Sequence, residues 1–468
     1  MGHLNLQNEM TEQLKTKELM EQAKTYAYDY IENLPYMDVS PSCEALENLL
    51  KFEEKMPEES SSPSEILLML HKYGSKATVA KSGAKYFGFV NGGVIPVALA
   101  TKWLTDIWDQ NSGLYIMSPI ASKLEEVCEK WLVDLFGLQK GTAAGFVSGS
   151  SVATICAVTV ARNKLLLNQG YDVHSKGLFG APKIRVVVGE EAHSSVWKAL
   201  SMLGIGRDMV EVVPTDGQGR MIIGKLPSLD SKTLVIAQAG NVTGGAFDSI
   251  DEICTLANQT SAWVHVDGAF GLWATVSDKR KYLTKGLEKA DSWSVDAHKT
   301  LNAPFDCGIV LCKDRDSLVS AMQASGSYLQ YSDHRDGMLY VPELSKRARS
   351  VELWAVMKYL GKAGIEKLVD ELCDNAEYFA EKLAENGFFI ENNVVFNQIV
   401  VRCENPEITS ATLKNIQASR KCWCSGALWQ NEPAIRISIC SWQTTRKDID
   451  DCVNIFVACR RMATPVIK

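Results

Sequence analysis

The chain has 468 residues, 46% of them hydrophobic, which is enough to bury a large core and form more than one domain. Its formal net charge of −7 argues against general nucleic-acid binding. No apolar stretch is long enough to cross a membrane, and the polar N-terminus lacks a secretory signal pattern. The 13 cysteines are scattered, without zinc-site spacing, so we expect reduced thiols, a cytoplasmic protein and no metal site.

Residues 1–85 are expected to form a helical segment. An amphipathic pattern predicts a helix over 11–34, and further helices are predicted over 44–55 and up to Leu70. This segment has apolar faces but too little mass to bury them alone. We therefore expect it to pack on a second copy of the chain and form a homodimer.

Residues 86–349 are expected to form a large α/β unit. Short β-branched runs alternate with helical patterns, which favours a mostly parallel sheet. The predicted helices are 120–136, 151–166 and 195–203, and the predicted strands are 183–188, 210–213, 233–238, 263–266, 292–295 and 308–312. The part between 313 and 349 is rich in Ser, Gly, Asp and Tyr and is expected to be a mobile loop region.

Residues 350–468 are expected to form a smaller α+β domain. A long helix begins near Ser350, and a helix is predicted over 365–386. Strands are predicted over 388–390, 398–402 and 434–441, with a last helix over 446–461.

Candidate catalytic residues follow two of the predicted strands. Asp267 follows the strand 263–266, and Lys299 follows the strand 292–295 in Asp-Ala-His-Lys, with a helical stretch expected between them. The carboxyl ends of parallel strands meet at one edge of the sheet, where ligands bind. A lysine amine condenses with an aldehyde, and a carboxylate keeps a pyridine nitrogen protonated. Together they predict an enzyme of pyridoxal 5'-phosphate (PLP).

Three further features fit this cofactor. Gly149-Ser150-Ser151 leads into a helix, and helix starts with nearby hydroxyls bind anions. His193 follows a strand, where its imidazole can lie flat on a pyridine ring. Asn241 and Thr243 lie in a glycine-rich turn after the strand 233–238.

The order of these features resembles that of the group II pyridoxal-dependent decarboxylases, from Tyr86-Phe-Gly-Phe to Arg436-Ile-Ser-Ile. The resemblance implies fold type I, with a mostly parallel seven-stranded sheet between helices, and decarboxylation of an L-amino acid to an amine and CO2. Lys299 would form the Schiff base, and Asp267 would pair with the pyridine nitrogen. His193 would stack on one face of the cofactor ring, and Ala269 would pack against the other. The phosphate would be held by Ser150, Ser151 and His298.

Two assignments rest on a looser match. Arg349 lies where the family has a basic residue and is expected to meet the substrate, although Arg436 is a second candidate for a substrate carboxylate. Tyr340 is expected to be a proton donor from the loop. The aromatic residues that either line a substrate pocket or belong to the core are Tyr86, Phe87, Trp423 and Trp429.

Other functions stay open at this point. The cofactor motifs are shared by aldolases, other carbon–carbon lyases and aminotransferases, and a catalytically inactive binding protein is a further alternative. Ser150 stands where the family commonly has glycine, and Thr300 where it often has tryptophan. These departures leave the substrate undetermined.

Overall fold

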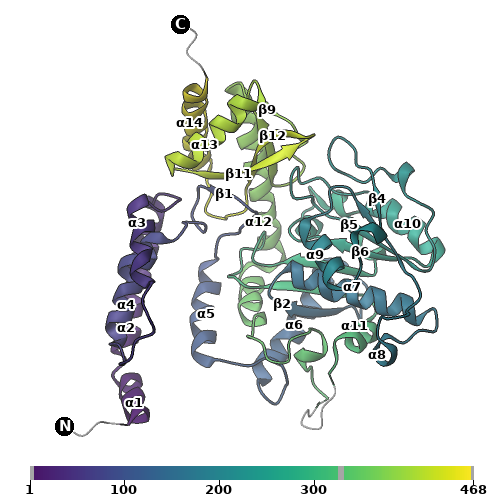
Figure 1. Ribbon diagram of the computed structural model, residues 1–468, viewed down its shortest axis with the longest axis horizontal. Helices are drawn as coiled ribbons and strands as arrows, with labels where there is room; N and C mark the ends of the chain where they lie inside the picture. Colours follow the sequence, from purple (N-terminus) through teal and green to yellow (C-terminus); the bar gives the residue numbers. More distant parts are fainter. Residues whose placement is uncertain (1–4, 325–330, 332, 465–468) are drawn as a thin grey trace.

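The computed structural model describes residues 5–324, 331 and 333–464, and Figure 1 shows three parts. A group of N-terminal helices stands beside a central α/β unit, and a smaller α+β unit lies next to the C-terminus. Within the described residues, no helix is long and apolar enough to cross a membrane.

The central sheet has seven strands in the order β2-β8-β7-β6-β5-β3-β4. All neighbours are parallel except that β8 runs antiparallel to both β7 and β2. The mostly parallel sheet expected from the sequence is therefore confirmed. The strands are β2 (Ala143–Val147), β3 (Arg185–Gly189), β4 (Val210–Val213), β5 (Thr233–Gln238), β6 (Trp263–Asp267), β7 (Ser292–Asp296) and β8 (Gly308–Cys312).

Helices cover both faces of this sheet because successive strand residues point to opposite sides. Val186 and Val188 pack with α7 (Ser150–Leu167), α9 (Ser194–Met202) and α11 (Arg315–Met322). Val187 packs on the other face, where the covering helices are α6 (Pro119–Leu135), α10 (Ile250–Thr260) and the first part of α12 (Ser350–Glu385).

The segment between β6 and β7 differs from expectation. Instead of one helix, it forms three short 3-10 turns over Gly271–Val276, Lys281–Thr284 and Leu287–Lys289. Gly286 has φ +80° between the last two turns, and Trp273 and Leu287 are fully buried. The segment, which the structure describes throughout, is therefore a series of short turns whose large side chains pack into the core, and it contains no α-helix.

The smaller unit is built on a five-stranded sheet in the order β1-β11-β12-β10-β9. Its strand β1 (Tyr86–Phe87) comes from the first quarter of the chain and pairs parallel with β11 (Trp423–Trp429). The other strands and helices are β9 (Phe389–Ile390), β10 (Gln398–Arg402), β12 (Glu432–Ser438), α13 (Pro406–Ser419) and α14 (Arg446–Ala463). The division at 86 and 350 remains a prediction.

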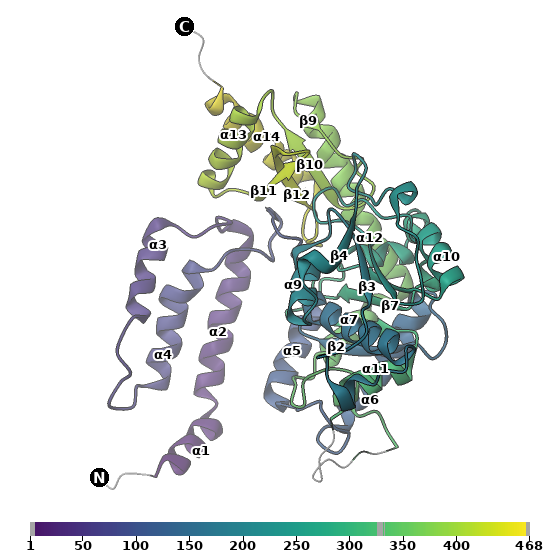
Figure 2. The same ribbon diagram turned by 45° about the vertical axis from the view of Figure 1, so that its right-hand side comes forward.

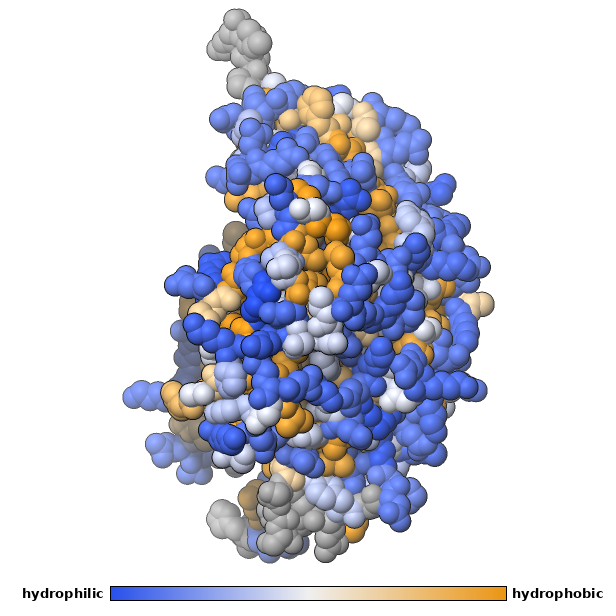
Figure 3. Space-filling model, turned by 90° about the vertical axis from the view of Figure 1, so that its right-hand side faces the viewer, coloured by the Kyte–Doolittle hydropathy of each residue, from blue (hydrophilic) through white to orange (hydrophobic). Residues whose placement is uncertain are grey.

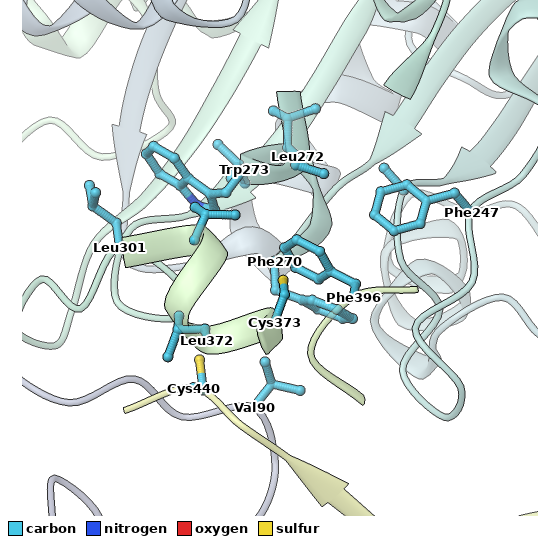
Figure 4. Packing of buried hydrophobic residues seen from close by; sticks show 14 of the residues in the cluster. Val90, Phe247, Phe270, Leu272, Trp273, Leu301, Leu372, Cys373, Phe396 and Cys440 are labelled. Atoms are coloured by element: carbon cyan, nitrogen blue, oxygen red, sulfur yellow. The ribbon is translucent and has the colours of Figure 1, made fainter. Parts of the chain in front are cut away.

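One hydrophobic core joins the central and the smaller unit. Figure 4 shows Trp273 and Leu301 of the central unit near Leu372 of α12, with Val90 and Cys440 below them. All five are buried. The turn that carries Lys299 therefore rests on packing shared by both units.

The N-terminal helices are α1 (Leu6–Thr16), α2 (Glu18–Asn33), α3 (Cys43–Glu47) and α4 (Pro63–Met69). The single helix expected over 11–34 is divided at Lys17, which has φ +60°. Of all residues in these four helices, only Ala45 is buried. Figure 2 shows α1, α2 and α4 standing clear of the central unit.

Apolar side chains are exposed along this side of the molecule. They include Leu6 and Leu14 of α1 and Leu104 and Ile107 of α5 (Pro96–Trp108). Figure 3, which views a different side, shows mostly hydrophilic residues with hydrophobic ones gathered near the middle. The remaining α-helix is α8 (Val173–Lys176).

Candidate active site

Asp267 and Lys299 lie at the same edge of the central sheet, as expected. Strands β6 and β7 are parallel; β6 ends at Asp267, opposite Ser294, and β7 ends two residues later at Asp296. Lys299 is the third residue after β7, following Ala297 and His298. Side chains from several strand ends therefore meet at this edge.

Lys299 is held by the carboxylate that ends β7. Its Nζ lies 3.0 Å from Asp296 Oδ2, and its side chain keeps 19% of its surface exposed. His298 Nε2 lies 3.7 Å from the same oxygen. Burial lowers the pKa of His298, against the opposing effect of Asp296. The His298 Nδ1 accepts a hydrogen bond from the backbone N–H of Cys307 at 3.1 Å, so the ring orientation is fixed.

The start of α7 reaches the same carboxylate. The Ser150 backbone N–H donates to Asp296 Oδ1 at 2.6 Å, and its hydroxyl donates to Oδ2 at 2.7 Å. Ser151, the next residue, is exposed. A helix N-terminus, hydroxyls and His298 thus face one another beside Lys299, which is a donor set suited to a phosphate.

Asp267 is buried without a cationic partner among the described residues. Its Oδ1 accepts from the Ser294 hydroxyl at 3.4 Å and from the Ala269 N–H at 3.3 Å. Behind it, Ser294 Oγ lies 3.4 Å from His265 Nε2, and burial lowers the pKa of His265 to about 4. A buried carboxylate of this kind favours a protonated nitrogen placed against it.

His193 begins α9 and faces this pair. Its Nδ1 accepts from the Ser195 N–H at 3.2 Å and lies 2.7 Å from the Ser195 hydroxyl. Burial lowers the pKa of His193, while Asp267 acts in the opposite direction and Lys299 adds to the lowering. The lowered pKa favours the neutral form of the imidazole. Ala269 is partly buried, and its carbonyl accepts from the Asp296 N–H at 2.9 Å.

Asn241 shapes a turn instead of offering its amide to a ligand. Its Nδ2 donates to the Gln218 carbonyl at 3.0 Å, and its Oδ1 accepts from the Gly244 N–H at 2.8 Å. Thr243 is partly exposed in the same turn. The turn also carries the carbonyl of Val242, which accepts from Arg436 Nη1 at 3.2 Å.

The structure does not agree with Tyr340 as a loop proton donor. Tyr340 is buried, and its hydroxyl accepts from Arg315 at 3.0 Å. Arg315 follows β8, whose last residue, Cys312, pairs with Ser292 at the edge where the parallel strands begin. The hydroxyl therefore points toward the edge opposite Lys299, and its role as a proton donor stays a prediction that this contact does not support.

Other predictions for 313–349 are also revised. Residues 315–322 form α11, and Arg335 and Lys346 are buried in ion pairs with Glu125 and Glu129. The expected mobile loop is thus largely fixed, although 325–330 and 332 lie outside the described residues.

Arg349 lies near the site but already has a partner. Its guanidinium pairs with Asp306 through contacts of 3.2 Å from Nε and 3.2 Å from Nη2. The neighbouring Phe305 ring stacks on His298 with centroids 4.2 Å apart. Arg349 therefore supports the wall of the site.

Sequence reasoning missed the loop 86–93, which covers the Lys299 turn. A Cβ at Gly92 would collide with the Lys299 carbonyl oxygen, so only glycine fits there. Phe89 and Val90 both have positive φ, 56° and 57°, which costs energy for residues with a Cβ. Val90 is buried whereas Phe89 is exposed, and such backbone strain is often found at functional sites.

The four aromatic candidates divide into two groups. Trp423 stacks on Tyr86 and on Phe89, with centroid distances of 5.2 and 5.3 Å, and so helps to hold this loop. Phe87 is fully buried in the core. Trp429 packs in a separate small cluster with Val400 and Ala434.

Comparison with known proteins identifies the family. The model of the pyridoxal-dependent decarboxylase conserved domain matches residues 47–404. The chain belongs to the pyridoxal-dependent decarboxylases. The cofactor of this decarboxylase is therefore PLP, and the enzyme is a carboxy-lyase that acts on an amino acid.

The chain is similar to several characterised decarboxylases. It is 30% identical to human acidic amino acid decarboxylase GADL1 over 360 residues, which cover 74% of this chain and 68% of that protein. It is 27% identical to the aromatic-L-amino-acid decarboxylase of Bacillus atrophaeus over 394 residues, 80% of each chain.

Solved structures share the fold of this decarboxylase. Mouse CSAD superposes with a TM-score of 0.87 at 21% identity, covering 95% of this chain and 98% of that one. Oryza sativa TDC with PLP and tryptamine gives 0.88 at 18% identity, covering 99% and 100%. At these identities the likeness establishes the fold alone.

The residues at the sheet edge fit PLP. In the described part of the chain, the Lys299 amine and a buried carboxylate without a cationic partner lie at one edge, the pKa of the His193 imidazole is lowered, and the start of α7 supplies hydrogen-bond donors. The carboxylate suits the ring nitrogen of PLP, the amine suits its aldehyde, and the donors at the start of α7 suit its phosphate.

Proposed function

We propose that this chain removes the α-carboxylate of an L-amino acid with an acidic side chain, using Lys299 to hold the cofactor. The observation that supports the proposal is the position of Lys299 and Asp267 at one sheet edge, with the buried Arg436 lacking a carboxylate partner among the described residues. The similarity to acidic amino acid decarboxylase GADL1 supports the acidic substrate class.

The chain's own residues prepare the site for this chemistry. Bound PLP supplies an electron sink for the electron pair that stays behind when CO2 leaves. Asp267 would keep the ring nitrogen protonated, and His193 and Ala269 would hold the two faces of the ring. Ser150, Ser151 and His298 hold the phosphate, and Ser150 then exchanges its bonds to Asp296 for bonds to the anion. Asn241 and Thr243 form the turn beside them.

Arg436 is the residue that we propose for the substrate α-carboxylate. It is buried, and its Nε has no hydrogen-bond partner. Burial lowers the pKa of Arg436, and no described carboxylate counteracts that effect. An unpaired buried cation is costly, so the site gains when an anion binds there. Arg349 is a weaker candidate because Asp306 already neutralises it.

The proposed assembly is a homodimer in the cytoplasm. Exposed apolar side chains on α1 and α5 are suited to burial against a second copy, and the segment 1–85 is proposed to form that contact. All thirteen cysteines are free, and twelve of them are buried, which suits a reducing compartment.

Carboxyl-labelled amino acids test the reaction directly. The holoenzyme is incubated with each acidic, neutral and aromatic L-amino acid, and CO2, amine and 2-oxo acid are measured together. The proposal expects equal amounts of CO2 and amine, with the highest kcat/KM for an acidic substrate. A 2-oxo acid without CO2 would indicate an aminotransferase, and an aldehyde product with glycine an aldolase. A neutral or aromatic preference would contradict the substrate class.

A further inference from the structure

A second cation that has no carboxylate partner among the described residues is Lys81. Lys81 belongs to the loop that precedes β1, and its ammonium sits over the Phe305 ring, 4.4 Å from the centroid. The Phe305 ring in turn stacks on His298, the neighbour of Lys299. Lys81 therefore approaches the reactive lysine from the side of the N-terminal third of the chain.

The backbone next to Lys81 is fixed against the smaller unit. The Ser82 carbonyl accepts from Gln443 Nε2 at 2.7 Å and from the Ser441 hydroxyl at 3.4 Å. Asn302, in the Lys299 turn, donates to the Cys440 carbonyl at 2.9 Å and its Oδ1 accepts from the Trp442 N–H at 3.1 Å. The same short segment, 440–443, thus holds both the Lys81 loop and the Lys299 turn.

No described carboxylate neutralises Lys81. Burial lowers the pKa of its ammonium, and the one neighbour that opposes the lowering is the thiol of Cys440. Lys299 and Lys81 both act to lower the pKa of the Cys440 thiol, against the effect of burial. Lys85, four residues later, differs in that it forms an ion pair with Asp451 at 3.0 Å. A partly buried ammonium with an aromatic face and no counter-ion is suited to bind an anion.

We infer that Lys81 determines substrate choice by binding the acidic group at the end of the substrate side chain. The inference rests on the proposed function, in which Arg436 takes the α-carboxylate. Two cations without a carboxylate partner among the described residues, Arg436 beside the Val242 carbonyl and Lys81 over the Phe305 ring, then serve the two carboxylates of an acidic amino acid. An amide or apolar side chain leaves Lys81 without a partner, so such substrates bind more weakly.

The test compares acids with their amides in matched variants. Lys81→Gln removes the charge but keeps much of the length, and Lys81→Arg keeps the charge. Lys76→Gln is the control, because Lys76 is an exposed lysine of the same segment. Steady-state constants are measured for glutamate against glutamine and for aspartate against asparagine. Inhibition by glutarate, which lacks an amino group, reports on binding without turnover.

In Lys81→Gln we expect KM for the preferred acid and the inhibition constant of glutarate to rise about 10- to 100-fold, the size of a lost charge-assisted contact. Turnover should stay within about threefold and the lysine-bound cofactor absorbance unchanged, since the PLP contacts remain. Lys81→Arg should restore most of the acid preference, and Lys76→Gln should equal the wild type.

Three outcomes overturn the inference in different ways. If the wild type decarboxylates acids and Lys81→Gln keeps the same acid-to-amide ratio of kcat/KM, Lys81 does not select the substrate, although the proposed function stands. If the wild type prefers neutral or aromatic amino acids, the acidic substrate class fails, and the role of Lys81 fails with it. Loss of the cofactor absorbance in Lys81→Gln would also contradict it, because the residue would then act on the cofactor.

Discussion

Lys299 Nζ lies 3.0 Å from Asp296 Oδ2, and this contact ties the reactive amine to the end of strand β7. The same carboxylate accepts both hydrogen bonds from Ser150, so the amine and the start of α7 are positioned by one group. The lysine is thus set relative to the phosphate donors before any ligand binds, which is the preorganisation that catalysis requires.

Asp267→Asn should keep PLP binding but lower kcat by roughly 10²- to 10³-fold, the typical cost of losing one preorganised charge. The neutral amide no longer stabilises a proton on the ring nitrogen. Asp291→Asn is the control, because Asp291 accepts from the Val264 N–H at the opposite end of β6. Cofactor titration and kcat are measured for both variants, and equal activity in the two would make the role of Asp267 structural.

Tyr340→Phe should leave turnover within about threefold of the wild type. Its hydroxyl bonds Arg315 away from the reactive edge, so its loss removes about 1 kcal/mol of stability instead. Single-turnover kinetics and urea denaturation separate the two effects. A large drop in kcat with unchanged stability would restore Tyr340 as a proton donor.

Acid should destabilise the fold through His265. Its pKa is about 4 in the folded protein against 6.5 ordinarily, so between these values the unfolded chain binds the extra proton. The stability present above pH 6.5 is therefore lost as pH falls toward 4, by about 3 kcal/mol.

Thermal midpoints between pH 4 and 7 measure this effect. His265→Asn should show a flatter pH dependence than the wild type, while the exposed His174→Asn should follow the wild type. The pKa values of the partly buried His193 and the buried His298 shift in the same direction, so these residues keep part of the slope in every variant. An unchanged slope in His265→Asn would count against a neutral, buried His265.

Ile107→Glu should weaken self-association and activity together. Ile107 is 70% exposed on α5, in line with Leu104, and a charge there opposes burial against a second copy. Sedimentation across a concentration series, with an activity assay, measures both properties. The control is Lys140→Glu, an exposed change elsewhere. A wild type that is monomeric and fully active at micromolar concentration would refute the dimer.

Much of the central sheet was predictable from the sequence. Strands β5 and β6 are short β-branched runs that alternate with helical patterns, and their parallel pairing follows from that order. Strand β2 was missed because Ala143-Ala-Gly-Phe-Val carries no such run and is defined by pairing with β8. Strand β11 was missed for a related reason, since its register depends on β12.

The candidate site was predictable only where motif and strand end coincide. Asp267 and Lys299 met this condition, whereas Tyr340 did not, because loop spacing cannot tell toward which edge a side chain points. Lys81 gave no signal, since it is more than two hundred positions from Lys299 in the sequence, and only folding brings it over Phe305. Asp296 belongs to the recognised Asp-Ala-His-Lys motif, but only the structure shows that its carboxylate pairs with the Lys299 amine.

The most direct test maps the lysine that carries the cofactor. The holoenzyme is reduced with borohydride and digested, and mass spectrometry locates the added pyridoxyl group. The account predicts the label on Lys299, with Lys299→Ala unlabelled, without turnover and without the lysine-bound absorbance band. A label on another lysine, or a reducible linkage that persists in Lys299→Ala, would contradict the assignment of this site.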